Sequence, residues 1–251
     1  MIVTNANENR TGPVENHQAN VKRAGRHQMK FETVAARLDG LKFTQPREGR
    51  ELYDFILRNA VQSILEIGFH HGVSTCYMAA ALHEQGRGHI ITLDQFGSRD
   101  KDPNLPELLA EFGLSDYVTP VFAERSYTWE LYKLLAADPR PTFDFCFHDA
   151  DHTWDTTSLA FFCMDKMLRP DGWMLFDDYG FTIEGSKSAM RQKRGKWPRE
   201  ERQTPAVAEV FRLLVAEHGD YGDVLFTKQG QWAWVQKRES RRFRDFLQRP
   251  G

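Results

Sequence analysis

The chain has 251 residues, of which 41% are hydrophobic and 27% are charged, and its formal net charge is −2 at pH 7. This balance is typical of a folded domain, and no apolar run approaches the ~18 residues that span a bilayer, so we expect a cytoplasmic protein without a membrane partner. A net charge this close to zero gives no attraction of the whole protein to nucleic acid.

The two ends of the chain differ in composition from its middle. Residues 1–25 are polar and lack the apolar core of a signal peptide, so they predict a disordered or loosely attached arm. We expect a single domain over residues 26–240 and a basic tail over residues 241–251. The three cysteines form no C-x-x-C pair, which favours buried thiols over a zinc or disulfide framework.

Strand-like and helix-like segments alternate along the domain. A helical pattern at residues 31–41 comes first, and we expect it to cover the sheet from outside. The pattern then predicts, in chain order, strand 63–68, helix 74–85, strand 89–94, helix 105–112, strand 118–123, helix 128–137, strand 143–149, helix 155–168, strand 173–178, helix 204–218 and strands 223–228 and 232–236. The last two strands are separated by Gln229-Gly230-Gln231, which is typical of a hairpin. The fold class is therefore α/β, with a Rossmann-like, doubly wound, mostly parallel seven-stranded sheet that closes in a terminal antiparallel hairpin.

A glycine turn follows the first predicted strand, in the run E-I-G-F-H-H-G-V-S-T. Gly68 and Gly72 permit positive φ and a close approach of a ligand, and the next helix directs its free N–H groups to the same place. The spacing matches neither the dinucleotide fingerprint nor a phosphate-binding P-loop. Asp94 ends the second strand, where an acid can accept the hydroxyls of a ribose. At this stage a turn without a ligand and a solvated or capping acid remain the alternatives.

Carboxylates follow two later strands of the predicted sheet. Asp149 and Asp151 follow the strand at 143–149, and Asp177-Asp178 ends the strand at 173–178. The carboxyl ends of parallel strands lie at one edge of a sheet, where these groups would repel one another without a cation. Hard oxygen ligands suit Mg²⁺ or another divalent cation. The alternative is that these acids cap the loops and the helix that follow them.

These motifs together resemble a known family of enzymes. E-I-G-x-x-x-G-x-S, F-D-F-C-F-H-D-A-D-H and M-L-R-P-D-G-W-M-L-F-D-D-Y are similar to the class I S-adenosylmethionine-dependent methyltransferases of the bacterial family that includes catechol, caffeoyl-CoA and antibiotic-sugar O-methyltransferases. The resemblance covers most of the chain between residues 45 and 235. In the catechol and caffeoyl-CoA enzymes the second acid pair is Asp-Asn, so Asp177-Asp178 is nearer to the antibiotic-sugar branch.

The resemblance implies a role for each matching residue. It implies divalent-metal ligands at Asp149, Asp177 and Asp178, and a general base at Asp151, with His152 as the second candidate. It also implies an S-adenosylmethionine pocket formed by Glu66, Gly68, His70, Gly72, Ser74, Asp94, Ala123 and Ser126.

The function implied by the resemblance is metal-assisted O-methylation of a hydroxyl on a small molecule, such as a phenol, a sugar or a natural-product intermediate, in a homodimer. Residues 180–203 form a basic insertion in the position of a substrate lid, and residues 187–202 hold seven basic and two acidic residues. That charge would favour an anionic acceptor, and a solvated loop is the alternative. Two other functions stay open, namely a nucleic-acid methyltransferase of the same fold and a cofactor-binding protein without catalysis.

Overall fold

The structure is a computed structural model, and it describes residues 31–41, 43–193, 196–222 and 224–238. The predicted N-terminal arm at 1–25 and the predicted tail at 241–251 lie outside the described residues. Within the described ranges, no helix combines the length and the hydropathy that a bilayer crossing requires.

Seven strands form one sheet in the order β3-β2-β1-β4-β5-β7-β6. Their bounds are β1 (Ser63–Ile67), β2 (His89–Gln95), β3 (Val118–Ala123), β4 (Phe143–His148), β5 (Leu168–Phe176), β6 (Leu225–Thr227) and β7 (Trp232–Gln236). The first five strands are parallel, and β7 pairs antiparallel with both β5 and β6. The predicted fold class and the predicted terminal hairpin are confirmed.

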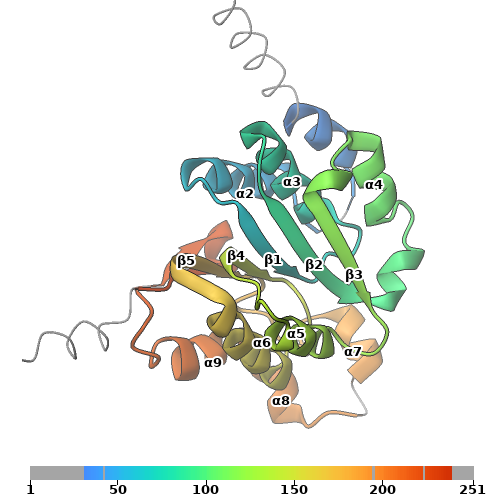
Figure 1. Cartoon of the computed structure of the whole chain (residues 1–251). Helices are drawn as coiled ribbons and strands as arrows, with labels where there is room; N and C mark the ends of the chain where they lie inside the picture. Colours follow the sequence, from blue (N-terminus) through green and yellow to red (C-terminus); the bar gives the residue numbers. More distant parts are fainter. Residues whose placement is uncertain (1–30, 42, 194–195, 223, 239–251) are drawn as a thin grey trace, which may run out of the picture.

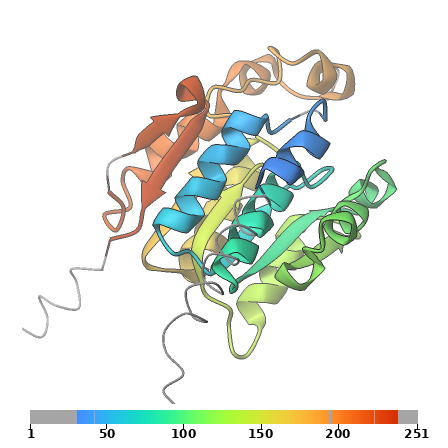
Figure 2. The ribbon, with the colours of Figure 1, turned by 90° about the horizontal axis from the view of Figure 1, so that it is seen from above.

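Helices cover both faces of this sheet (Figure 1). One face carries helix 31–38, α2 (Pro46–Arg58), α3 (Val73–Gln85) and α4 (Leu105–Phe112), and Figure 2 shows the first two, in blue, lying over this face and running along the strands. The other face carries α5 (Tyr127–Ala136), α6 (Trp154–Met167) and α9 (Ala206–Val210), which continues into a π-helical turn (Phe211–Val215). The helix predicted at 204–218 therefore covers fewer residues in the structure, and its winding changes from α-helical to π-helical at Phe211.

Alternate side chains of each central strand enter two separate cores. On β4, Phe145 and Phe147 pack in the core under α2 and α3, whereas Cys146 packs in the core under α5 and α6. Because both faces are buried, the strands are apolar throughout, as parallel strands in this class of fold are. The site therefore cannot lie on a sheet face and is restricted to a strand edge or to the strand ends.

Helix α2 was not predicted, since the sequence pattern before residue 50 indicated only one helix. It begins with Pro46 at its first turn, and the Glu48 side chain accepts a hydrogen bond from the Gln45 backbone N–H at 2.8 Å. Leu52 and Ile56 are fully buried against the sheet. The buried residues of this helix, Gly49, Leu52, Tyr53 and Ile56, recur at helical spacing, so the apolar periodicity was present in the sequence and was overlooked, and the capping pattern was a second indicator.

The strand order reverses between β1 and β4, which is where ligands bind in doubly wound sheets. Backbone hydrogen bonds tie the strand ends together there. The Gly68 N–H donates to the Leu93 carbonyl at 2.8 Å, the Asp149 N–H donates to the Ile67 carbonyl at 2.7 Å, and the Asp177 N–H donates to that of His148 at 3.0 Å. The loops that leave β1, β2, β4 and β5 are thus held at one edge of the sheet.

Candidate active site

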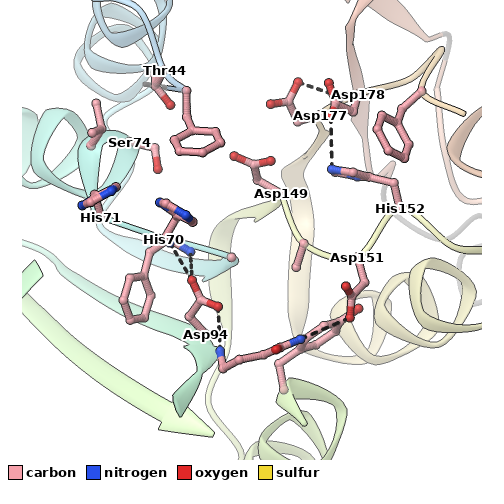
Figure 3. Close-up of a pocket in the computed structure, with 18 of the residues that line it drawn as sticks. Thr44, His70, His71, Ser74, Asp94, Asp149, Asp151, His152, Asp177 and Asp178 are labelled. Carbon is pink, nitrogen blue, oxygen red and sulfur yellow. Dashed lines mark hydrogen bonds and ion pairs between the residues drawn. The ribbon is translucent and has the colours of Figure 1, made fainter. Parts of the chain in front are cut away.

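A cavity of about 460 Å³ lies at the carboxyl ends of these four strands (Figure 3). Its volume falls within the range of small-molecule sites, which is roughly 300–1,000 Å³. Residues from all four strand ends and from the terminal hairpin line it. They are Phe43, Thr44, Gly68, Phe69, His70, His71, Val73, Ser74, Asp94, Gln95, Tyr127, Asp149, Ala150, Asp151, His152, Asp177, Asp178, Phe181 and Lys228.

Most of the residues singled out in the sequence meet in this cavity, but four do not line it. Ala123 is buried at the end of β3, and the Ser126 side chain caps α5 by accepting a hydrogen bond from the Trp129 N–H at 3.3 Å. Gly72 packs against Leu105 behind the turn, and Glu66 lies beneath the cavity. Their assignment to the cofactor pocket stays a prediction, with the first two beside the cavity and the last two below its surface.

Glu66 is a buried acid that supports the cavity from below. Its carboxylate accepts hydrogen bonds from the hydroxyls of Ser74 at 2.6 Å, Thr75 at 2.5 Å and Thr92 at 2.7 Å. Burial raises the pKa of Glu66 to about 7, against the lowering effect of the three hydroxyl groups. Because Ser74 also lines the cavity, Glu66 orients a cavity side chain without reaching the ligand space itself.

The backbone conformation of the turn after β1 requires glycine at positions 68 and 72. Gly68 has a φ of +91°, and a Cβ there would lie 2.1 Å from the Asp149 carbonyl oxygen. Gly72 has a φ of +92°, and a Cβ there would lie 2.4 Å from the Leu105 side chain. The close contact between Gly68 and Asp149 brings the ends of β1 and β4 together, and it leaves the first N–H groups of α3 beside the cavity as a site for an anion.

Asp94 and His70 form one wall of the cavity (Figure 3). The Asp94 carboxylate accepts hydrogen bonds from the N–H groups of Phe69 at 3.0 Å, His70 at 2.5 Å and Gln95 at 2.6 Å. Burial raises the pKa of Asp94 above its ordinary value. Burial, with Lys101 and His71 nearby, lowers the pKa of His70 to about 4, so its ring is neutral. The buried Nδ1 of His70 has no hydrogen-bond partner in the described part of the chain and is available to a ligand.

The opposite wall is acidic and holds one lysine–carboxylate ion pair and one histidine–carboxylate contact. The Lys228 Nζ lies 3.0 Å and 3.1 Å from the two carboxylate oxygens of Asp177. The His152 Nε2 lies 3.2 Å from Asp178 Oδ2. Burial raises the pKa of Asp149 well above its ordinary value, and the nearby carboxylates of Asp177 and Asp178 add to that effect. This wall therefore combines carboxylates with two basic side chains, of which Lys228 was not predicted.

Comparison with known proteins identifies the kind of domain that forms this cavity. Residues 65–179 match a family model described as "Methyltransferase domain". Residues 65–179 form a methyltransferase domain. The match extends from β1 to the residue after Asp178, so it includes the residues that line the cavity except for Phe43, Thr44, Phe181 and Lys228. No curated protein matches the sequence.

Solved structures share the fold of this methyltransferase. An O-methyltransferase from Bacillus cereus in complex with S-adenosylhomocysteine is 19% identical, with 84% of this chain and 88% of that chain covered and a TM-score of 0.57. The O-methyltransferase TomG from Streptomyces achromogenes, in complex with S-adenosylmethionine, is 20% identical, with coverages of 84% and 90% and a TM-score of 0.58. The S-adenosylhomocysteine-bound methyltransferase PaMTH1 from Podospora anserina is 14% identical, with coverages of 94% and 100% and a TM-score of 0.58. At these identities the likeness establishes the fold alone.

The acidic wall of the methyltransferase does not fit the predicted magnesium site. Among the residues that the structure describes, no group of three or more His, Cys, Asp or Glu side chains is arranged to hold a metal ion. Lys228 occupies both oxygens of Asp177, and His152 pairs with Asp178. Two of the three predicted ligands, Asp177 and Asp178, are therefore held by other partners, and the residues present do not form a metal site together with Asp149.

The predicted lid, residues 180–203, contains two short helices, α7 (Lys187–Lys193) and α8 (Arg199–Gln203). Its two ends are joined, since the Glu184 N–H donates to the Arg202 carbonyl at 2.9 Å. Phe181 lines the cavity, and its ring centroid lies 5.1 Å from that of His152. The insertion thus starts at the cavity of the methyltransferase, and its action as a lid stays a prediction.

Proposed function

We propose that this methyltransferase transfers a methyl group from S-adenosylmethionine to a hydroxyl of a small molecule. The proposal depends mainly on one observation, which is that the glycine turn with Asp94 and the acidic wall with His152 line the same cavity. A donor at the first wall and an acceptor at the second would therefore face each other, as an in-line displacement requires. The shared fold of solved O-methyltransferases supports the choice of an oxygen acceptor.

The first wall has the groups that the methyl donor needs. Asp94 would accept the ribose hydroxyls, and the N–H groups at the start of α3, together with Ser74, would hold the carboxylate of the methionine end. Bound S-adenosylmethionine supplies an electrophilic methyl group on a sulfonium. The cluster of acids in the cavity complements that positive charge.

On the second wall, His152 is positioned to remove the proton of the acceptor. Asp178 accepts the Nε2–H of the ring at 3.2 Å, which leaves the lone pair on Nδ1, a buried atom that has no hydrogen-bond partner among the described residues. For Nδ1 to take the proton, the ring has to turn toward the acceptor. Asp151, which the resemblance favoured as the general base, is exposed, and its carboxylate accepts only a long hydrogen bond of 3.5 Å from the Gln95 side-chain amide. As the acceptor oxygen bonds to the methyl carbon, the carbon–sulfur bond breaks, the sulfur leaves as a neutral thioether and the proton moves to His152.

Two measurements test this proposal. Isothermal titration with S-adenosylhomocysteine should give saturable binding to the full chain, and failure to bind would refute the assignment of the first wall. Turnover is then followed by mass spectrometry with methyl-labelled S-adenosylmethionine and a panel of phenols, sugars and their carboxylated forms, with oligonucleotides as a separate arm. Methylation of oligonucleotides alone would refute a small-molecule acceptor, and a preference for carboxylated acceptors would support a role for the basic insertion.

Homodimerisation stays a prediction that analytical ultracentrifugation can test.

A further inference from the structure

Lys228 lies at the tip of the terminal hairpin and reaches into the acidic wall of the cavity. It belongs to η4 (Lys228–Gly230), between β6 and β7. Its ammonium bridges both oxygens of Asp177, lies 3.8 Å from Glu48 Oε1, and sits 5.5 Å from the ring centroid of Trp232. Its side chain is only 21% exposed. An ammonium with these neighbours belongs to the cavity wall and is not a solvated surface charge.

The backbone holds Lys228 in this place at an unfavourable conformation. Lys228 and Gln229 have φ values of +48° and +56°, in the left-handed region that side chains with a Cβ rarely adopt. The loop is fastened to the acidic wall, since the Tyr179 N–H, next to Asp178, donates to the Gln231 carbonyl at 2.9 Å. Consecutive positive φ values are typical of a tight hairpin turn, so the turn between β6 and β7 sets the backbone position of Lys228 beside the acidic wall.

The ammonium occupies the place that a metal ion would need. Divalent cations bind carboxylate oxygens at about 2.0–2.6 Å, so an ion on Asp177 would have to share its oxygens with a positive charge about 3 Å away from them. Repulsion between the two cations makes the pair unfavourable. One lysine also partly balances Asp149, Asp177 and Asp178, which weakens the electrostatic reason for a metal that the sequence suggested.

We propose that Lys228 is a built-in cation that replaces the divalent metal and binds the acceptor oxygen during methyl transfer. This inference rests on the proposed O-methylation. An ammonium has three N–H donors. Both oxygens of Asp177 accept from this ammonium, and Glu48 at 3.8 Å is beyond hydrogen-bond distance, so among the described residues at least one N–H is left to donate to an acceptor in the cavity that Lys228 lines. Donation to that oxygen stabilises the negative charge that it develops when His152 takes its proton.

The test compares Mn²⁺ binding, measured by electron paramagnetic resonance, with turnover in the full chain and three variants. These are Lys228→Ala, which removes the cation, Lys228→Arg, which keeps it, and Lys133→Ala, which removes an exposed lysine of α5 as a matched control. We expect the wild type, Lys228→Arg and Lys133→Ala to bind Mn²⁺ at least about tenfold more weakly than Lys228→Ala, because only the last exposes the carboxylates. Wild-type turnover should not change in EDTA, and Lys228→Ala turnover should fall and be partly restored by Mn²⁺.

Several outcomes would overturn the inference. Mn²⁺ binding to the wild type as tight as to Lys228→Ala, loss of wild-type turnover in EDTA with recovery on adding Mg²⁺, or full turnover of Lys228→Ala would each do so. If Lys228→Ala does not fold, the EDTA and Mn²⁺ measurements on the wild type and Lys228→Arg still decide. Titration of S-adenosylhomocysteine into the same proteins separates the two proposals. If S-adenosylhomocysteine does not bind, the proposed function is refuted, whereas the Mn²⁺ affinities still decide whether Lys228 takes the place of a metal.

Discussion

Replacement of Glu66 by Gln should change how the stability of the domain depends on pH. Burial raises the pKa of Glu66 from 4.5 to about 7 in the folded protein, so the folded state binds this proton more tightly than the unfolded chain does. The contribution of Glu66 is therefore most favourable below pH 4.5, is lost as the pH rises from 4.5 to 7, and is constant above that. A pKa difference of this size corresponds to about 3 kcal/mol of unfolding free energy.

The assay is urea unfolding of the wild type and Glu66→Gln at several pH values between 4.5 and 8. Groups distant from Glu66 titrate equally in both proteins, and only nearby acids such as Asp94 and Asp149 respond to the loss of its charge. The difference between the two unfolding free energies therefore reports mainly Glu66, and it should shift by about 3 kcal/mol in favour of the variant as the pH rises. Glu217→Gln is the matched control, since Glu217 is exposed and its curve should parallel that of the wild type. A difference for Glu66→Gln that stays flat across the range would show that the carboxyl is not desolvated.

Three further predictions concern the cavity directly. Gly68→Ala should lower the free energy of unfolding in urea by about 2 kcal/mol or more, because the left-handed backbone and the Asp149 carbonyl both oppose a Cβ. Gly86→Ala is the control, since Gly86 is also at positive φ but has open space around it, so this variant should show the backbone cost alone. Asp94→Ala should weaken S-adenosylhomocysteine binding by at least about tenfold in calorimetry, and unchanged affinity would remove Asp94 from the pocket. His152→Ala should lower kcat by about 10²- to 10⁴-fold with little change in S-adenosylhomocysteine affinity, and an unaltered kcat would return the role of base to Asp151.

The convergence of the strand ends could be predicted because it depends only on the order of elements along the chain. Alternating strands and helices specify a parallel sheet, and a parallel sheet brings its carboxyl ends to one edge. This places Asp94, Asp149 and Asp177 in one cavity without knowledge of any side-chain contact. The glycines are explained by the same local geometry, since the turn after β1 needs positive φ whether or not a ligand is present.

The environment of Glu66 depends on the strand register, which the sequence pattern does not specify. In the sheet Glu66 pairs with Thr92 of β2, while the next helix places Ser74 and Thr75 over the same carboxylate. Assignment to the cofactor pocket was based on the position of Glu66 in the motif, two residues before Gly68. The sheet shows the acid facing three hydroxyls beneath the cavity, and this could be recognised only once two strands were aligned.

Lys228 was missed because its position depends on a long-range contact made by the terminal hairpin. The hairpin returns β7 alongside β5, so a residue 51 positions after Asp177 comes to face it. The sequence placed Lys228 at the end of a predicted strand, with nothing to distinguish it from other basic residues of the C-terminal region. Without that contact the carboxylates appeared to lack a cation, which is why the sequence favoured a metal.

The two walls of the cavity are therefore encoded in different ways, and this has a functional consequence. The wall proposed to hold the methyl donor comes from one continuous stretch, β1 to β2, and its contacts are local. The wall proposed to hold the acceptor joins the end of β4, the end of β5 and the hairpin, which are far apart in the sequence. Changes in the hairpin or in the insertion after Asp178 can alter the second wall while the hydrogen bonds of Asp94 and Glu66 stay intact. Acceptor choice can thus vary on this scaffold without loss of the donor site, and the residues around Lys228 are where it would vary.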